Sequence, residues 1–212
     1  FMPAMAWADG EPTEDTTEET TYAVYIGEQG YSTVGAAINA AGTSATTIRV
    51  VADTTENVVI PTGADITLNI EENVTLTNSG SNHTITNNGT LTITGKGTVE
   101  NKNTSAKGAL YNAPGATVNL NGCTFTGDKW YVIKNFGTMT IDGAAVIQND
   151  AGSSGIDNGY YGNPANDCGV TYPTAATSVG LTIKSGNLSG GMNTVKNDDF
   201  GVLVVDGGTF EN

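Results

Sequence analysis

The sequence predicts an all-β solenoid, a parallel β-helix of about six coils and three sheets, with a short α-helix over its N-terminal end. One observation is a repeated segment. It has an apolar residue two positions before an Asn, then a turn with Gly, then a strand with two apolar residues two apart. Composition is the other. The chain has 28 glycines in 212 residues and only 14% charged residues, and it is rich in Thr and Asn. These residues are poor helix formers and suit short strands joined by tight turns.

The Asn of each repeat sets the length of a coil. Successive intervals are 25, 23, 23 and 39 residues, and the first three fit one solenoid turn of three short strands. The last interval holds extra residues, which we interpret as an inserted loop at 159–179. Asn tolerates turn geometry, and its amide both donates and accepts, so we predict a hydrogen-bonded ladder from coil to coil. Its members are Asn87 (or Asn88), Asn112, Asn135, Asn158 and Asn197.

Three sets of apolar residues predict the core. A strand with two apolar residues cannot bury them alone, but coils stacked about 4.8 Å apart bury them as columns. The first set follows the Gly turn: Leu91 and Ile93, Val118 and Leu120, Met139 and Ile141, Leu181 and Ile183, Leu203 and Val205. The second comprises Val99, Phe125, Val146, Leu188 and Phe210, and the third Ile85, Leu110, Ile133, Ile156 and Val195. A further repeat at residues 60–70, which lacks the Asn before the Gly turn, brings the count to about six coils.

The residues before the coils predict a cap, and those before the cap predict export. Apolar spacing indicates a helix at 33–41 within a cap at 22–43, with Ser32 as N-cap and Gly42 at its end. The β-helix then fills 44–212. Residues 1–8 contain an Ala-x-Ala pattern, typical of the end of a signal peptide. Residues 9–21 are acidic and rich in Thr, which predicts a disordered linker. We therefore expect a secreted or cell-surface bacterial protein.

The helix at 36–41, the strand after it and the coils punctuated by Asn and Gly resemble right-handed parallel β-helix proteins of the pectin-lyase-like superfamily. The resemblance covers about residues 22–212 and concerns architecture, without a single family signature. It implies a right-handed solenoid, as does the general rule for parallel crossovers. The superfamily includes polysaccharide lyases, glycoside hydrolases, adhesins and exported surface proteins, so the resemblance does not select one function.

The catalytic residues that the superfamily's enzymes share are mostly missing. Lyases of this type are associated with Ca²⁺-binding carboxylates and an Arg or Lys base, but Arg49 is the only arginine and lies at the end of the solenoid next to the cap. The hydrolases resemble one another in Asn-x-Asp, Asp-Asp, Gly-His-Gly and Arg-x-Lys motifs, of which this chain has only a likeness to the second, at Asp198 and Asp199. We expect His83, the only histidine, in an exposed turn, and Asp142 and Asp206 as solvated carboxylates.

Binding residues are sought in the insertion and beside it. Aromatic rings here could stack on sugar rings, or could instead pack the loop onto the solenoid. The candidates are Trp130, Tyr131, Tyr160, Tyr161 and Tyr172. Cys123 and Cys168 could form a disulfide that pins the insertion, or could remain unpaired. No spacing typical of a zinc site or an EF-hand is present, and Asp198 with Asp199 could form a weak Ca²⁺ site.

The net charge of the chain limits the classes of partner that it can bind. A net charge of −14 excludes nucleic acid, because phosphate binding needs a basic surface. No apolar stretch is long enough to span a membrane. We expect a monomeric, non-catalytic surface module without a cofactor, adhesin-like or carbohydrate-binding, whose partner is a glycan or a host or cell-surface ligand. The alternatives are a fragment of a polysaccharide lyase or glycoside hydrolase that lacks its catalytic coils, and a passive stalk.

Overall fold

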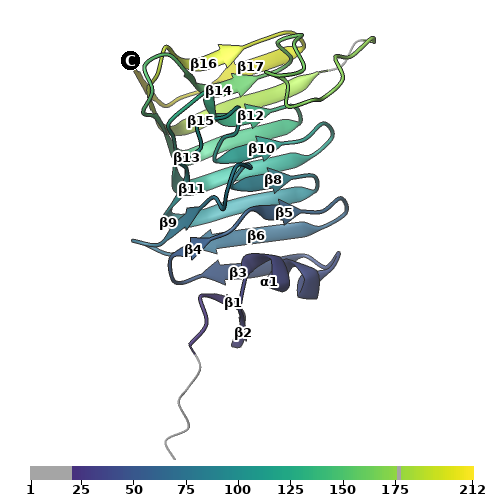
Figure 1. The fold of residues 1–212 in the computed structure, drawn as a ribbon, viewed down its shortest axis with the longest axis vertical. Coiled ribbons are helices and arrows are strands. Elements are labelled where there is room, and N and C mark those ends of the chain that lie inside the picture. The colour runs from purple at the N-terminus through teal and green to yellow at the C-terminus, as the bar shows by residue number, and fades with distance from the viewer. Residues whose placement is uncertain (1–20, 176–177) are drawn as a thin grey trace, which may run out of the picture.

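The computed structural model describes residues 21–175 and 178–212 (Figure 1). The predicted all-β parallel solenoid of about six turns is confirmed. The predicted signal-peptide remnant at 1–8 and the linker at 9–21, except for its last residue, lie outside the described residues.

The strands stack along one axis, with the cap at one end and the C-terminus at the other (Figure 1). The cap contains β1 (Val24–Ile26), β2 (Gln29–Tyr31) and α1 (Val34–Ala41). The early coils contain β3 (Thr46–Val50), β4 (Thr54–Thr55), β5 (Val58–Ile60), β6 (Asp65–Ile70), β7 (Thr75–Thr77) and β8 (Ile85–Asn87). The middle coils contain β9 (Thr90–Asn101), β10 (Leu110–Asn112), β11 (Thr117–Gly127), β12 (Tyr131–Asn135), β13 (Thr138–Gln148) and β14 (Ser154–Asn158). The last coils contain β15 (Val179–Gly190), β16 (Asn193–Asn197), β17 (Gly201–Val205) and β18 (Thr209–Glu211).

Hydrogen bonds join these strands into two sheets where the sequence predicted three. The smaller sheet has the order β16-β14-β12-β10-β8-β5, and the larger holds twelve strands with β17-β15-β13-β11-β9-β6-β3-β1-β2 as its main path. In the middle coils the first and second predicted strands are one long strand that bends at a glycine. At Gly95, where φ is +100°, a Cβ would collide with the carbonyl oxygen of Ile70. Glycine therefore lets the strand bend while its backbone hydrogen bonds to the neighbouring strands continue on both sides of the bend.

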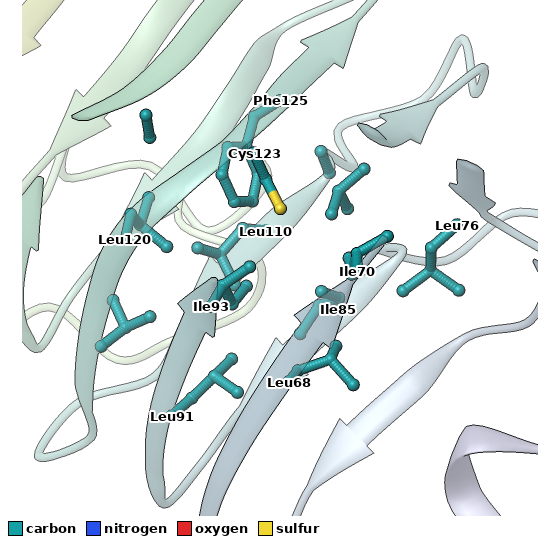
Figure 2. Packing of buried hydrophobic residues seen from close by; sticks show 14 of the residues in the cluster. Leu68, Ile70, Leu76, Ile85, Leu91, Ile93, Leu110, Leu120, Cys123 and Phe125 are labelled. Atoms are coloured by element: carbon teal, nitrogen blue, oxygen red, sulfur yellow. The ribbon is translucent and has the colours of Figure 1, made fainter. Parts of the chain in front are cut away.

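The apolar columns form the core, as the alternation requires. In the third column Ile85, Leu110, Ile133 and Ile156 are in register on neighbouring strands and are fully buried. Figure 2 shows Leu91, Ile93 and Leu120 of the first column facing the same interior as Leu110. Burying one such side chain contributes roughly 1.5 to 3 kcal/mol, so stability is spread along the stack.

The predicted helix covers the N-terminal end of this core. It buries Val34, Ala37 and Ile38, and it ends at Gly42. Its N-cap is Thr33, not Ser32 as expected, because the Thr33 hydroxyl accepts from the Ala36 N–H at 3.0 Å. Glu56 of the first coil accepts from the first two N–H groups of the helix, those of Val34 and Gly35, at 2.8 and 2.9 Å. These contacts fasten the cap to the solenoid.

A hairpin that the sequence did not predict completes the cap. Strands β1 and β2 pair antiparallel, and β1 pairs antiparallel with β3. The hairpin therefore covers the edge of the larger sheet, which would otherwise present unpaired backbone groups. Among the described residues, no helix is long and apolar enough to cross a membrane.

Candidate functional site

A chain of asparagine amides runs through the bend between the two sheets. Each Nδ2 donates to the Oδ1 of the Asn one coil further on. The distances are 2.8 Å for Asn87 to Asn112 and for Asn112 to Asn135, and 2.7 Å for Asn135 to Asn158 and for Asn158 to Asn197. The first four are fully buried, whereas Asn197 is exposed. Asn88 is not a member. The ladder is thus internal, and it holds the coils together without offering a surface to a ligand.

The insertion folds against the outer face of the smaller sheet and buries a lysine there. Lys134 of β12 is fully buried, and its ammonium donates to Asp157 at 3.1 Å, to the Gly159 carbonyl at 3.0 Å and to Asp167 at 3.4 Å. It also lies 4.6 Å from the centre of the Phe136 ring. A buried ammonium needs this many partners because its desolvation is costly.

Asp167 organises the insertion around this lysine. Its carboxylate accepts from the backbone N–H groups of Tyr161, Gly162 and Asn163, at 2.8, 2.8 and 3.2 Å. The side chain is almost completely buried. One carboxylate therefore shapes the loop and anchors it to the sheet. Lys134 and Asp167 were not among the residues predicted from the sequence.

The repeated sequence does contain a pattern that indicates this charge cluster. The residue just before each of the last three ladder asparagines is charged, namely Lys134, Asp157 and Lys196. The strand register places these residues side by side on β12, β14 and β16. Opposite charges on neighbouring strands attract one another, so the alternation of sign indicates an ionic column.

The insertion separates the candidate aromatic residues into buried and exposed ones. Tyr131 and Tyr160 are only 2% and 4% exposed, so neither ring presents a face on which a ligand could stack. The Tyr131 hydroxyl donates to the Ala106 carbonyl at 2.7 Å, and Tyr160 packs against Phe136. For these two rings, packing of the loop onto the solenoid is the observed role.

Trp130, Tyr161 and Tyr172 remain exposed, by 41%, 51% and 40%. Trp130 and Tyr161 line one groove of about 410 Å³. Tyr172 borders a different hollow on the insertion, and its hydroxyl donates to Asp199 at 2.7 Å. Tyr131, although almost fully buried, also borders this groove, so the structure brings three of the five predicted rings together there, two of them exposed.

Polar and charged groups complete the groove. Its walls include Ser153, Asn166, Asn193, Asp157, Lys129 and Lys196. Lys129 pairs with Asp150 at 3.0 Å, and Lys196 pairs with Asp198 at 2.9 Å while lying 4.1 Å from the centre of the Tyr161 ring. The groove thus combines apolar ring faces with hydroxyl, amide and charged groups, a combination suited to ligands with both apolar faces and hydroxyls.

Both cysteines are free, so the unpaired alternative, not the disulfide, describes the structure. Cys123 is buried in the core (Figure 2), and its thiol donates to the Thr94 carbonyl at 3.2 Å. Burial raises the pKa of this thiol to about 11, so it is protonated at neutral pH. The sulfur of Cys168 lies 2.9 Å from the Tyr131 hydroxyl oxygen. Each thiol therefore has a polar partner of its own.

His83 is buried, and the expectation of an exposed turn histidine is wrong. It is 6% exposed, its Nδ1 accepts from the Gly108 N–H at 3.0 Å, and its ring stacks on Tyr111 with centres 4.9 Å apart. Burial, assisted by the charge of Lys107, lowers the pKa of His83 to about 3. The imidazole is neutral at physiological pH and serves packing.

The remaining carboxylate candidates lie on the surface or in ion pairs. Asp142 and Asp206 are exposed, and Asp142 accepts from the Ser185 hydroxyl at 2.7 Å. Asp198 is paired with Lys196, and Asp199 with Tyr172. Within the part of the chain that the structure describes, no three His, Cys, Asp or Glu side chains gather as a metal site would require.

Comparisons with protein-family models, with curated proteins and with solved structures found no match to this chain.

Proposed function

We propose that the chain is a non-catalytic module of an exported or cell-surface protein, related in architecture to the pectin-lyase-like superfamily, that binds a glycan in the groove between Trp130 and Tyr161. The observation that carries the proposal is the pairing of two exposed rings with hydroxyl and amide groups in one groove. Sugar rings have apolar faces that stack on aromatic side chains and hydroxyls at their edges that exchange hydrogen bonds with such groups.

The backbone at Trp130 also supports a role in binding. Its φ is +59°, in the left-handed region that Gly or Asn occupies most easily. A bulky residue there is disfavoured by roughly 1 to 2 kcal/mol. The conformation places the ring on the surface, while the next residue, Tyr131, is buried. Strain of this kind is often found at binding sites, and the ring that it exposes forms one wall of the groove.

Replacing Trp130 by Ala should weaken glycan binding about tenfold, since one lost stacking contact is worth about 1.4 kcal/mol. The purified protein is first screened on a glycan array, and a retained glycan is then titrated by calorimetry. Tyr172→Ala is the matched control, because Tyr172 is as exposed as Trp130 but lies outside the groove. Its affinity should stay within about twofold of the unmodified chain.

An array that retains no glycan would exclude the proposal and favour a passive stalk. Equal losses of glycan affinity in the Trp130 and Tyr172 variants would indicate that the glycan binds instead at the hollow on the insertion that Tyr172 borders. Release of reducing ends or unsaturated uronates from a polysaccharide would exclude the non-catalytic assignment.

A further inference from the structure

Five charged side chains meet beneath the Tyr161 side of the groove, and their positive and negative charges are unequal in number. Two are ammonium groups, those of Lys134 from β12 and Lys196 from β16. Three are carboxylates, those of Asp157 from β14, Asp167 from the insertion and Asp198 after β16. With all five ionised the cluster carries one negative charge more than positive. A proton is the smallest cation that would neutralise it.

Asp157 is the carboxylate whose hydrogen bonding is incomplete. The residue is 6% exposed, and its Oδ2 accepts from Lys134. Its Oδ1 is buried and has no partner among the described residues. Asp198 lies beside Asp157, because the backbone N–H of Asp198 donates to the carbonyl of Asn158, the residue after Asp157, at 2.8 Å. Two ionised carboxylates cannot bond to each other, but one proton between them would give Oδ1 the partner that it lacks.

We infer that Asp157 and Asp198 share one proton, and that this proton holds the Tyr161 wall of the groove in place. The contacts form a continuous chain. Lys134 holds Asp157, the shared proton joins Asp157 to Asp198, and Asp198 holds Lys196 over the Tyr161 ring. The inference concerns regulation of the groove, and its consequence for a glycan rests on the proposed function.

Loss of the proton would place two carboxylates against each other. Asp157 is fixed by its ion pair with Lys134, whereas Asp198 lies in the bend after β16. Asp198 would therefore move away and draw Lys196 from the Tyr161 ring. Burial raises the pKa of Asp157 to about 6, Lys134 opposes the rise and Asp198 adds to it. The proton is thus bound below about pH 6 and lost above it, so the groove is ordered in acid and loosened at neutral pH.

The pKa values of two other groups near the groove, Asp150 and Tyr131, are shifted away from this range. The hydrogen bond from Ser153 and the ion pair with Lys129 lower the pKa of Asp150. Burial raises the pKa of the Tyr131 phenol, which lies against the same cluster. A transition near pH 6 at the groove would therefore report the carboxyl pair.

Asp157→Asn is the sharpest test, because an amide imitates a protonated carboxyl at the same size. Its Oδ1 can accept from Lys134 while its Nδ2 donates to Asp198. Asp198→Asn tests the same idea from the other side, since its amide can donate to Asp157 and accept from Lys196. Asp150→Asn is the matched control in a neighbouring ion pair.

The first measurement needs no ligand. Trp7→Phe leaves Trp130 as the only tryptophan, and its fluorescence is followed from about pH 4.5 to about pH 8. We expect one transition near pH 6 in the parent and in Asp150→Asn, and none in Asp157→Asn or Asp198→Asn, which should keep the acid-form signal. A transition that survives in both amide variants, or is missing in the parent, would overturn the inference.

The second measurement uses the glycan that the array retains. Its affinity for the parent should fall by about fivefold between about pH 5 and about pH 7.5, and Asp157→Asn should keep the acid affinity throughout. A parent affinity that does not change with pH would overturn the role of the proton in binding. If no glycan is retained at any pH, the proposed function fails alone, because the fluorescence titration still decides whether the pair holds a proton.

Discussion

Replacing Asn135 by Asp should lower the free energy of unfolding by about 3 kcal/mol at neutral pH, although the two side chains have the same size and shape. Asn135 is the middle member of the ladder. Its Nδ2 donates to Asn158 Oδ1 at 2.7 Å and to the carbonyls of Gly137 and Gly180 at 3.3 and 3.1 Å. An ionised carboxylate has no proton to donate, so it would face three acceptors in a buried place. Urea unfolding measures the loss.

Asn197→Asp is the control for this substitution. Asn197 accepts from Asn158, which a carboxylate can also do, and the one bond that it donates, to the Gly201 carbonyl at 2.9 Å, lies at the exposed end of the ladder, where water can replace it. We expect a loss of less than about 1 kcal/mol. The Asn135 variant should also regain stability in acid, because a protonated carboxyl can donate again. Equal losses at the two positions, or a loss at Asn135 that does not change with pH, would show that the ladder's donors do not stabilise the coils.

The coils and the ladder could be predicted because the solenoid repeats in the sequence. Leu110 and Ile133 stand 23 residues apart, and each lies two positions before an Asn, so periodicity alone places them in one column. Stacking then pairs each repeat with the next. The same reasoning could not decide how many sheets result. Backbone pairing between coils continues through a bend such as Gly95 only if the neighbouring coil approaches closely enough. That distance is set by two coils together and cannot be read from the sequence of one repeat.

The candidate site was harder to predict because the insertion does not repeat. His83 and Lys134 are residue types that usually lie at the surface, yet both are buried here, and Lys134 lies under the insertion. Trp130 lies in the turn before β12, where strand alternation does not apply, and its left-handed backbone exposes its ring while Tyr131 is buried. Local conformation of this kind is set by tertiary contacts, so pattern alone identified the aromatic region but not the exposed members.

Replacing Lys134 by Met should lower the free energy of unfolding by roughly 3 to 5 kcal/mol and free the insertion from the sheet. Methionine can fill the space of the lysine stem, but it leaves Asp157 and Asp167 buried without their ammonium partner. The two carboxylates would then repel each other across the contact that holds the loop. Urea unfolding measures the global loss, and limited proteolysis within residues 159–175 measures release of the loop.

Lys129→Met is the matched control, because that lysine makes an ion pair on the surface, where its side chain is 46% exposed. Its loss should stay below about 1 kcal/mol. Adding Asp157→Asn to Lys134→Met removes one of the unpaired charges and should recover part of the lost stability. A Lys134→Met chain as stable as the parent, or a double variant no better than the single one, would show that the buried ammonium does not hold the insertion. Early cleavage of the insertion should also separate this variant from Asn135→Asp, because the ladder joins coils whereas Lys134 joins the loop to them.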